Sequence, residues 1–450
     1  MSNYLFSEFE TVSEKAWKQK INVDLKGLDY NETLLWKTNE GITVKPFYTK
    51  DDQTHQKTNR SNDDFNICES IFIDNEIIAN KLAIDSLKRG ANAIEFKADA
   101  DFDYKEVLND LDKFSAYFYF NFTFLDVNFI SEISDFLKKE KVYFNIDIIG
   151  NLAQTGNWFS NLNKDHQELE ELITKVSKPA IAVNASLYQN AGATNTQQLA
   201  YALAHANEYL NHFGADITDK IHFNFSVGSN YFFEVAKLRA FRILWNSLLN
   251  EYDVTNNQAH IFTQPSLRNK TLYDYNVNML RTTSECMSAV LGGANTVSNV
   301  SYDEIFHKSN EFGERISRNQ LLILKEESGF ENAHDFADGS YYIEAITKEL
   351  AENALEIFKQ IEQGGGFLKQ LKEGVIQRKI SESAEKEQLL FNKNEIVLLG
   401  TNKIQNEKDQ MKNDLELFPF VKQRHQKTLI QPIIQRRLAE KLEQERLENE

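Results

Sequence analysis

The side chains of this sequence that could do chemistry are nine histidines, two cysteines and a few carboxylates within apolar runs. None of the histidines stands in an H-E-x-x-H or another metal-ligand spacing. Cys68 and Cys286 form no C-x-x-C pair, so the sequence indicates neither a disulfide framework nor a zinc or redox motif. It also contains no G-x-S-x-G nucleophile elbow. We therefore expect no metal site and no hydrolase chemistry of that type.

Two polar residues lie at the ends of predicted strands. Asp147 lies toward the end of the apolar run 142–149. A carboxylate at the C-terminal end of a barrel strand is either catalytic or a structural hydrogen-bond acceptor, and both readings stay open here. His260 begins the predicted strand 260–263, so we expect it at the opposite end from a barrel active site.

These residues need a framework, and from about residue 76 short apolar runs alternate with amphipathic helical stretches. Strands that alternate with helices form a parallel sheet. Seven to eight such units over roughly 250 residues predict a closed (β/α)8 TIM-type barrel, with an open doubly wound sheet as the alternative. The expected strands lie at residues 93–96, 116–124, 142–149, 180–184, 221–227, 260–263 and 295–300.

The barrel is expected to occupy residues 76–403, together with trailing helices. Residues 1–75 lack clear periodicity and predict an extended N-terminal arm for subunit contact, with a flexible leader as the alternative. Residues 404–450 are densely charged and predict a helical tail, with a helix over 430–449 that either caps a partner or projects into solvent.

Composition excludes several classes of function. A formal net charge of −17 argues against nucleic-acid binding, which needs a basic surface. It also disfavours anionic substrates unless a local basic funnel exists. The N-terminus has no apolar signal-peptide core, and no apolar run approaches the roughly 18 residues of a membrane span. We expect a cytoplasmic protein that does not bind membranes.

Two segments carry a specific resemblance. The sequence AGAT at 191–194 follows a predicted strand, and FFEVAKLRA at 232–240 follows in the next unit. At this spacing they resemble the barrel of the methylmalonyl-CoA mutase family. The similarity covers roughly residues 30–403, with further agreement at 36–48, 315–319, 326–329, 338–344, 364–366 and 399–403.

The resemblance implies radical rearrangement of methylmalonyl-CoA and succinyl-CoA on adenosylcobalamin, chemistry that the cofactor itself carries. In this family a second domain with a D-x-H-x-x-G motif holds cobalamin, and its histidine ligates cobalt. That motif does not occur in this sequence. The resemblance therefore implies that this chain binds no cofactor and that a partner subunit holds adenosylcobalamin.

The same resemblance marks the pocket residues to inspect. In catalytic members a Tyr-His pair that contacts substrate lies just before AGAT. Ser186 and Leu187 occupy those positions here. Tyr188 and Gln189 lie next to them, and a shifted alignment would restore the tyrosine but not the imidazole.

Further pocket positions also depart from the family pattern. Catalytic members have an Arg followed two residues later by a His, and His260 and Phe262 stand at those positions here. A tyrosine of the family aligns with Cys68, and an arginine of the family has no counterpart within 151–176. A substrate carboxylate in a dry barrel needs a fixed cation and hydrogen-bond donors. Leucine and phenylalanine are expected to fill the lumen instead.

These departures predict no catalytic residue. The chain thus resembles the small, non-catalytic subunit of heterodimeric family members, paired with a catalytic large subunit. One alternative is an active acyl-CoA mutase barrel that works with a separate cobalamin-binding chain. Another is a stand-alone binding or regulatory barrel protein.

Overall fold

The computed structural model describes residues 8–10, 12–53, 64–255, 257–332, 336–422 and 426–450. Its centre is an eight-stranded sheet in which all neighbouring strands are parallel. The strand order is β6-β5-β4-β3-β10-β9-β8-β7. The strands are β3 (Asn66–Phe72), β4 (Ala93–Ala98), β5 (Tyr117–Phe122), β6 (Lys141–Phe144), β7 (Ile181–Asn184), β8 (Ile221–Val227), β9 (Ile261–Pro265) and β10 (Thr296–Ser298).

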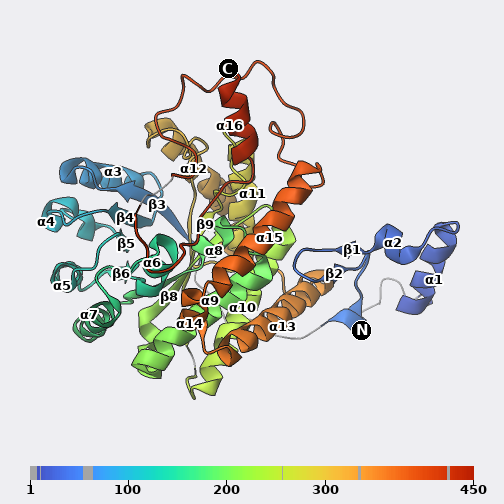
Figure 1. Ribbon diagram of the computed structural model, residues 1–450, viewed down its shortest axis with the longest axis horizontal. Coiled ribbons are helices and arrows are strands. Elements are labelled where there is room, and N and C mark those ends of the chain that lie inside the picture. Colours follow the sequence, from blue (N-terminus) through green and yellow to red (C-terminus); the bar gives the residue numbers. More distant parts are fainter. Residues whose placement is uncertain (1–7, 11, 54–63, 256, 333–335, 423–425) are drawn as a thin grey trace.

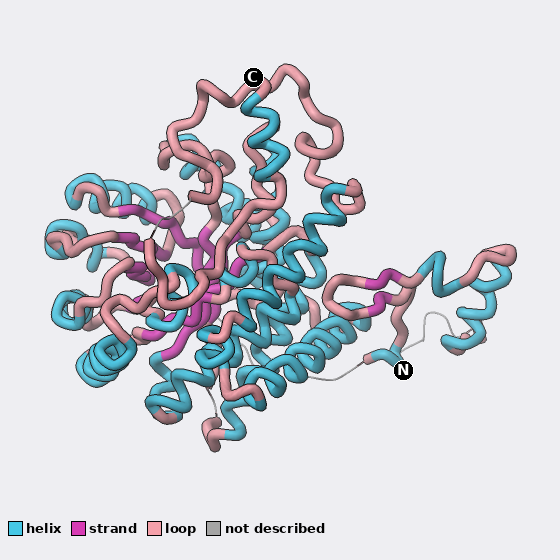
Figure 2. The backbone as a smooth tube through the Cα atoms, in the orientation of Figure 1, coloured by secondary structure: helices cyan, strands magenta, loops and turns pink. Residues whose placement is uncertain are grey.

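The two ends of this sheet meet, which closes it into a barrel. A parallel bridge joins Ile146, just after β6, to Ile181 in β7. The Ala182 amide donates to the Ile146 carbonyl at 3.0 Å. The predicted (β/α)8 TIM-type barrel is confirmed, and the open-sheet alternative is wrong. Helices surround the strands (Figures 1 and 2), as expected when parallel strands are joined by helical crossovers.

Alternation within the strands separates the lumen from the helical layer. In β5, Phe118, Phe120 and Phe122 belong to the large core under the helices, whereas Tyr119 belongs to a separate cluster inside the barrel. This period of two is what a pleated strand dictates. Polar and aromatic residues therefore face the lumen, and mostly apolar residues pack outward.

The helices that follow the strands include α10, which packs against α9, α11 and α13. No helix within the described part of the chain is both long enough and apolar enough to cross a membrane. The helices of the barrel region and its extension are α3 (Glu76–Lys88), α4 (Tyr104–Val107), α5 (Val127–Phe136), α6 (Ile148–Thr155), α7 (Leu162–Lys175), α8 (Ser186–Asn190), α9 (Asn195–Phe213), α10 (Tyr231–Glu251), α11 (Val277–Leu291), α12 (Glu311–Leu322), α13 (Tyr341–Gln363), α14 (Phe367–Lys372) and α15 (Val375–Asn392).

The N-terminal segment projects to one side of the barrel (Figure 1) and contains α1 (Glu14–Asp24), α2 (Tyr30–Leu34), β1 (Trp36–Lys37) and β2 (Thr43–Val44). Helix α1 has no buried residue. The segment is anchored through Glu40, whose carboxylate accepts from the Thr196 amide at 2.9 Å. Strand β3 belongs to the barrel, so the arm ends before residue 65 and not at residue 75 as the sequence predicted.

The C-terminal tail differs from the expected long helix. Within the described residues of the tail, only α16 (Glu440–Glu448) is helical, and residues 426–439 run without regular structure as a strap over the barrel. Leu429 and Ile433 donate backbone hydrogen bonds to Gly156 (2.9 Å) and Ala153 (2.7 Å). This part of the tail is therefore bound to the barrel at α6 and its C-cap.

Candidate functional site

The lower part of the lumen is closed by an aromatic plug, which we define as Tyr119, Tyr143, His260 and Phe262. The ring of Tyr119 lies 5.0 Å from that of Tyr143 and 4.9 Å from that of Phe262, centroid to centroid. The His260 ring stacks on Tyr143 at 4.1 Å, and its Nε2 lies 2.8 Å from the Tyr119 hydroxyl. These contacts place large rings on the barrel axis.

The imidazoles at this level are neutral. Burial, reinforced by nearby His222, holds the pKa of His260 well below its ordinary value. Burial likewise lowers the pKa of His222 to about 3. The Nε2 of His222 lies 2.7 Å from Oδ1 of Asn145. His260 lies on the N-terminal side of β9, as expected, and forms part of the plug rather than of an open site.

Above the plug, at the carboxyl ends of the strands, lies a cavity of about 620 Å³. This is the end of the barrel where enzymes of this fold bind their substrates. Phe262 forms part of its floor, while Ser186 and Leu187 line its wall. We expected leucine and phenylalanine to fill the lumen: Phe262 is part of the plug, but Leu187 lines a cavity that the two side chains leave open.

One wall of the cavity is charged. Glu95 is 2% exposed and accepts from Ser70 Oγ at 2.5 Å and from Asn121 Nδ2 at 3.2 Å. Lys97 Nζ lies 3.4 Å from Glu95 Oε2. Burial works against the Lys97 ammonium, but Glu95 and Glu304 outweigh it and raise the pKa of Lys97. The cation is therefore retained and is tied to carboxylates.

Tyr188 and Gln189, which follow the aligned pocket positions Ser186 and Leu187, turn away from the cavity. Tyr188 is fully buried and its hydroxyl lies 2.9 Å from Nδ1 of His205. The amide of Gln189, in its correct orientation, bonds to the backbone of Ser226 and Gly228. The structure thus brings Ser186, Leu187 and Phe262 to one cavity but leaves Tyr188 and Gln189 outside it.

Asp147 caps helix α6 directly after β6. Its carboxylate accepts from the Gly150 amide at 2.7 Å, the Asn184 amide at 2.9 Å and the Tyr209 hydroxyl at 2.7 Å. His205 Nε2 lies 2.9 Å from the same group. Burial alone would raise the pKa of Asp147, but His205 and these donors lower it. All of this geometry supports the structural reading, since the donors hold β6, β7, α6 and α9 together.

The motif that carried the resemblance also proves structural. Lys237 of α10 is fully buried, and its Nζ donates to the Ser226 carbonyl at 2.8 Å and to Gln198 Oε1 at 2.9 Å. Arg242, two residues beyond the motif on the same helix, donates to the carbonyls of Ala259 and Gly293, each at 2.7 Å. Such buried cations need partners. The motif therefore locks α10 onto the barrel.

The strap covers the mouth of the cavity. Arg436 and Leu438 donate backbone hydrogen bonds to Asn190 (3.1 Å) and Arg268 (2.8 Å), which lie in the loops after β7 and β9. Gln435 of the strap is itself a cavity-lining residue. A large planar ligand such as a corrin would have to displace these contacts to reach the lumen.

The cavity does not fit the cobalamin that the family resemblance implies for a partner. No histidine lies among the cavity-lining residues, and the described part of the chain holds no cluster of metal-ligating side chains. The buried imidazoles of His205, His222 and His260 each contact a protein partner through at least one ring nitrogen, and none of the three lines the cavity. No described residue is therefore placed to ligate cobalt at the barrel mouth.

Sequence analysis missed the charged and amide residues of the cavity. Glu95, Lys97, Asn184 and Asn224 all line it, and they belong to β4, β7 and β8. The available signal was the period of two within each strand, which places these polar residues on the lumen face.

Comparison with known proteins identifies the family. The family model described as methylmalonyl-CoA mutase matches residues 137–449. The methylmalonyl-CoA mutase small subunit of Porphyromonas gingivalis is 33% identical, over 89% of this chain and 71% of that protein. The methylmalonyl-CoA mutase of Rhizobium meliloti is 34% identical, over 59% of this chain. The methylmalonyl-CoA mutase large subunit of Streptomyces virginiae is 31% identical, over 51% of this chain.

This chain spans 38% and 33% of the last two proteins, about a third of their length. The match to the family model includes α10 and the AGAT segment at 191–194, which the structure shows to be parts of the barrel framework. The chain therefore belongs to the methylmalonyl-CoA mutase family.

Proposed function

We propose that this chain is the non-catalytic small subunit of an adenosylcobalamin-dependent methylmalonyl-CoA mutase, an isomerase. In this proposal it binds and stabilises a catalytic large subunit that holds the cofactor. The observation that carries the proposal is the lumen. Tyr119 and Phe262 obstruct the lumen, and the described residues that line the cavity above them include neither the imidazole nor the free cation that a carboxylate-bearing thioester needs.

Charge supports the same conclusion. Among the described residues that line the cavity, Lys97 is the only cationic one, and Glu95 and Glu304 already interact with it electrostatically. An anionic substrate would have to compete with two carboxylates for one ammonium group. The alternative of an active barrel served by a separate cobalamin chain gains no support from this geometry.

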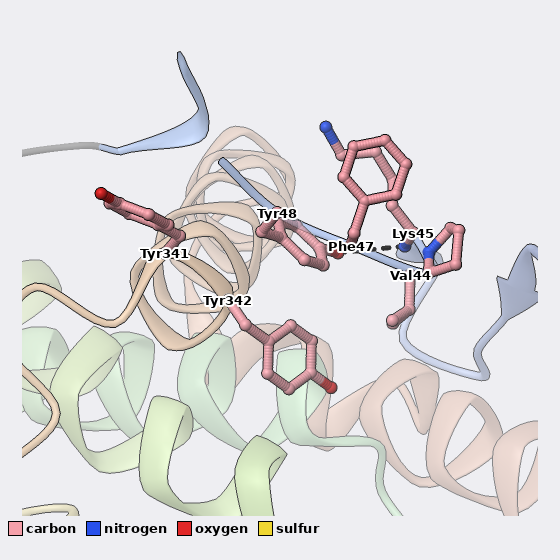
Figure 3. Close-up of a pocket in the computed structure, with 7 residues that line it drawn as sticks. Val44, Lys45, Phe47, Tyr48, Tyr341 and Tyr342 are labelled. Carbon is pink, nitrogen blue, oxygen red and sulfur yellow. Dashed lines mark hydrogen bonds between the residues drawn. The ribbon is translucent and has the colours of Figure 1, made fainter. Parts of the chain in front are cut away.

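We further propose that the arm and the adjoining ends of α10 and α13 contact the large subunit. Phe232 and Tyr341 are 47% and 37% exposed and lie beside the arm. A shallow pocket of about 390 Å³ opens between the arm and α13, with Phe47, Tyr48 and Tyr342 on its walls (Figure 3). Exposed aromatic residues around such pockets are typical anchors of protein interfaces.

The test uses the full chain and the large subunit from the same organism. Wild-type chain alone is expected to show no mutase activity and no cobalamin binding, and to co-purify with the large subunit while raising its stability. Replacing both Phe232 and Tyr341 by serine is expected to weaken the complex at least about tenfold. The matched control is Ile78→Ser, which changes an apolar side chain that is 58% exposed on α3, across the barrel from the arm.

Two results would contradict the proposal. Turnover of a CoA ester by this chain with only an isolated cobalamin-binding protein would show that the lumen is catalytic. Equal affinity of the double variant and the wild type for the large subunit would place the contact elsewhere. A cytoplasmic location belongs to the same proposal, and cell fractionation tests it.

A further inference from the structure

The cavity above the aromatic plug has a lining that the scaffolding role does not require. We propose that it binds a small, neutral, polyhydroxylated molecule of about the size of a sugar, held by amide side chains. A volume of about 620 Å³ falls within the range of small-molecule sites. The inference does not depend on the proposed function, because it concerns this chain alone.

The first observation is a row of asparagines. Four consecutive strands of the barrel, β5 to β8, each contribute one: Asn121, Asn145 and Asn184 at or next to the carboxyl end of their strand, and Asn224 in the middle of β8. All four line the cavity. Asn184 and Asn224 are direct partners in the strand register, so their side chains lie side by side on the lumen face.

The second observation is that these amides have spare hydrogen-bonding capacity. Asn145 is 7% exposed, and its Nδ2 has no partner among the described residues although it lines the cavity. Oδ1 of Asn224 likewise has no partner within the described chain. A buried donor and a buried acceptor left unpaired cost stability, so their presence together indicates a ligand group that both donates and accepts. A hydroxyl group does both.

The third observation concerns charge and selects against ions. Glu95 is saturated by Ser70, Asn121 and Lys97, and Gln264 Nε2 adds a donor at 3.3 Å. The Glu95 carboxylate is therefore already compensated and does not call for a cationic ligand. Lys97 is equally engaged and does not call for an anion. The unpaired capacity at this lining includes the neutral amides of Asn145 and Asn224.

The strap completes the enclosure. Gln435 lines the cavity from above, and its side-chain amide makes no hydrogen bond within the described part of the chain. Phe159 contributes an apolar surface at the rim. Amides around a ring of hydroxyls, with an aromatic surface against carbon-bound hydrogens, form a combination suited to a polyol of limited size.

Isothermal titration calorimetry of the full chain tests the proposal, with myo-inositol and D-glucose as neutral probes. Succinate and putrescine serve as anionic and cationic probes. We expect saturable binding of at least one polyol with a dissociation constant of about 1 mM or below, and no binding of the ions. Asn224→Leu, which keeps the volume but removes the amide, is expected to weaken polyol binding at least about tenfold.

The matched control is Asn109→Leu, an exposed asparagine in the loop after α4, which is expected to bind like the wild type. Thermal unfolding of each variant without ligand establishes that the fold persists. Gln435→Ala supplies a second test of polyol binding, in the strap and outside the barrel wall. The proposal is overturned if neither polyol binds, if succinate or putrescine binds instead, or if Asn224→Leu leaves polyol binding unchanged.

Discussion

Replacement of His222 by glutamine isolates the contribution of one buried neutral imidazole to stability. Burial lowers the pKa of His222 from 6.5 to about 3 in the folded protein. Between these two pKa values, His222 is therefore protonated in the unfolded chain and neutral in the folded chain. The contribution of His222 to the free energy of unfolding is fully present above pH 6.5 and is lost as the pH falls from 6.5 toward 3. At pH 5 the loss amounts to about 2 kcal/mol, since each pH unit in that window is worth about 1.4 kcal/mol.

The variant keeps the local hydrogen bond, because the glutamine amide can donate to Asn145 Oδ1 as His222 Nε2 does now at 2.7 Å. The assay is urea unfolding by circular dichroism at pH 7.5 and pH 5. Between pH 7.5 and pH 5, the free energy of unfolding of the wild type is expected to fall by about 2 kcal/mol more than that of H222Q. Burial is the largest cause of the lowered pKa of neighbouring His260 and acts in both proteins, so the difference between them is set mainly by His222.

The control is His212→Gln, because His212 is exposed to water in the folded chain. It is expected to keep the wild-type pH dependence. If H222Q and wild type lose the same free energy between pH 7.5 and pH 5, then His222 is not held neutral by burial. The account of a dry plug beneath the cavity would then be refuted.

Three further predictions follow from the geometry. Asp147→Asn places an amide donor among the donors of Gly150, Asn184 and Tyr209, and is expected to cost about 3 kcal/mol in chemical unfolding. Gly156→Ala is expected to loosen the strap. Gly156 has φ +81°, and a Cβ there would lie 2.7 Å from the Ile430 carbonyl oxygen. Faster amide hydrogen exchange over residues 428–438 would show this loosening. The thiol of Cys286 is fully buried with a raised pKa, so a thiol reagent is expected to modify it only after unfolding.

Much of the barrel was predictable because parallel strands read as short apolar runs. The predicted strand 221–227 coincides with β8, and 180–184 differs from β7 by a single residue. The predicted strand 142–149 is wrong at its C-terminal boundary, because Asp147 caps a helix that begins at Ile148. Hydrophobicity alone cannot mark that boundary, since Ile148 and Ile149 are buried in the helix as they would be in a strand.

Strand β3 was missed for a different reason. Asn66, Glu69 and Ser70 interrupt its apolar pattern because they face the lumen or pair with other residues, as Glu69 does with Arg318 at 2.9 Å. The site was predictable only in part. Resemblance located Ser186, Leu187 and Phe262, which do line the cavity. It gave no warning of the asparagines, because their role depends on strands that lie side by side only in the closed barrel.

The strap also constrains the order in which this protein is completed. Its attachment points on Ala153 and Gly156 are formed long before residues 429 and 433 leave the ribosome. At roughly 5–20 residues per second, translation leaves the barrel without its cover for many seconds. A small molecule thus meets the lumen of the nascent chain before the strap is in place. Gln435 is the last of the cavity-lining residues to be synthesised, so the complete site forms only when the strap has docked.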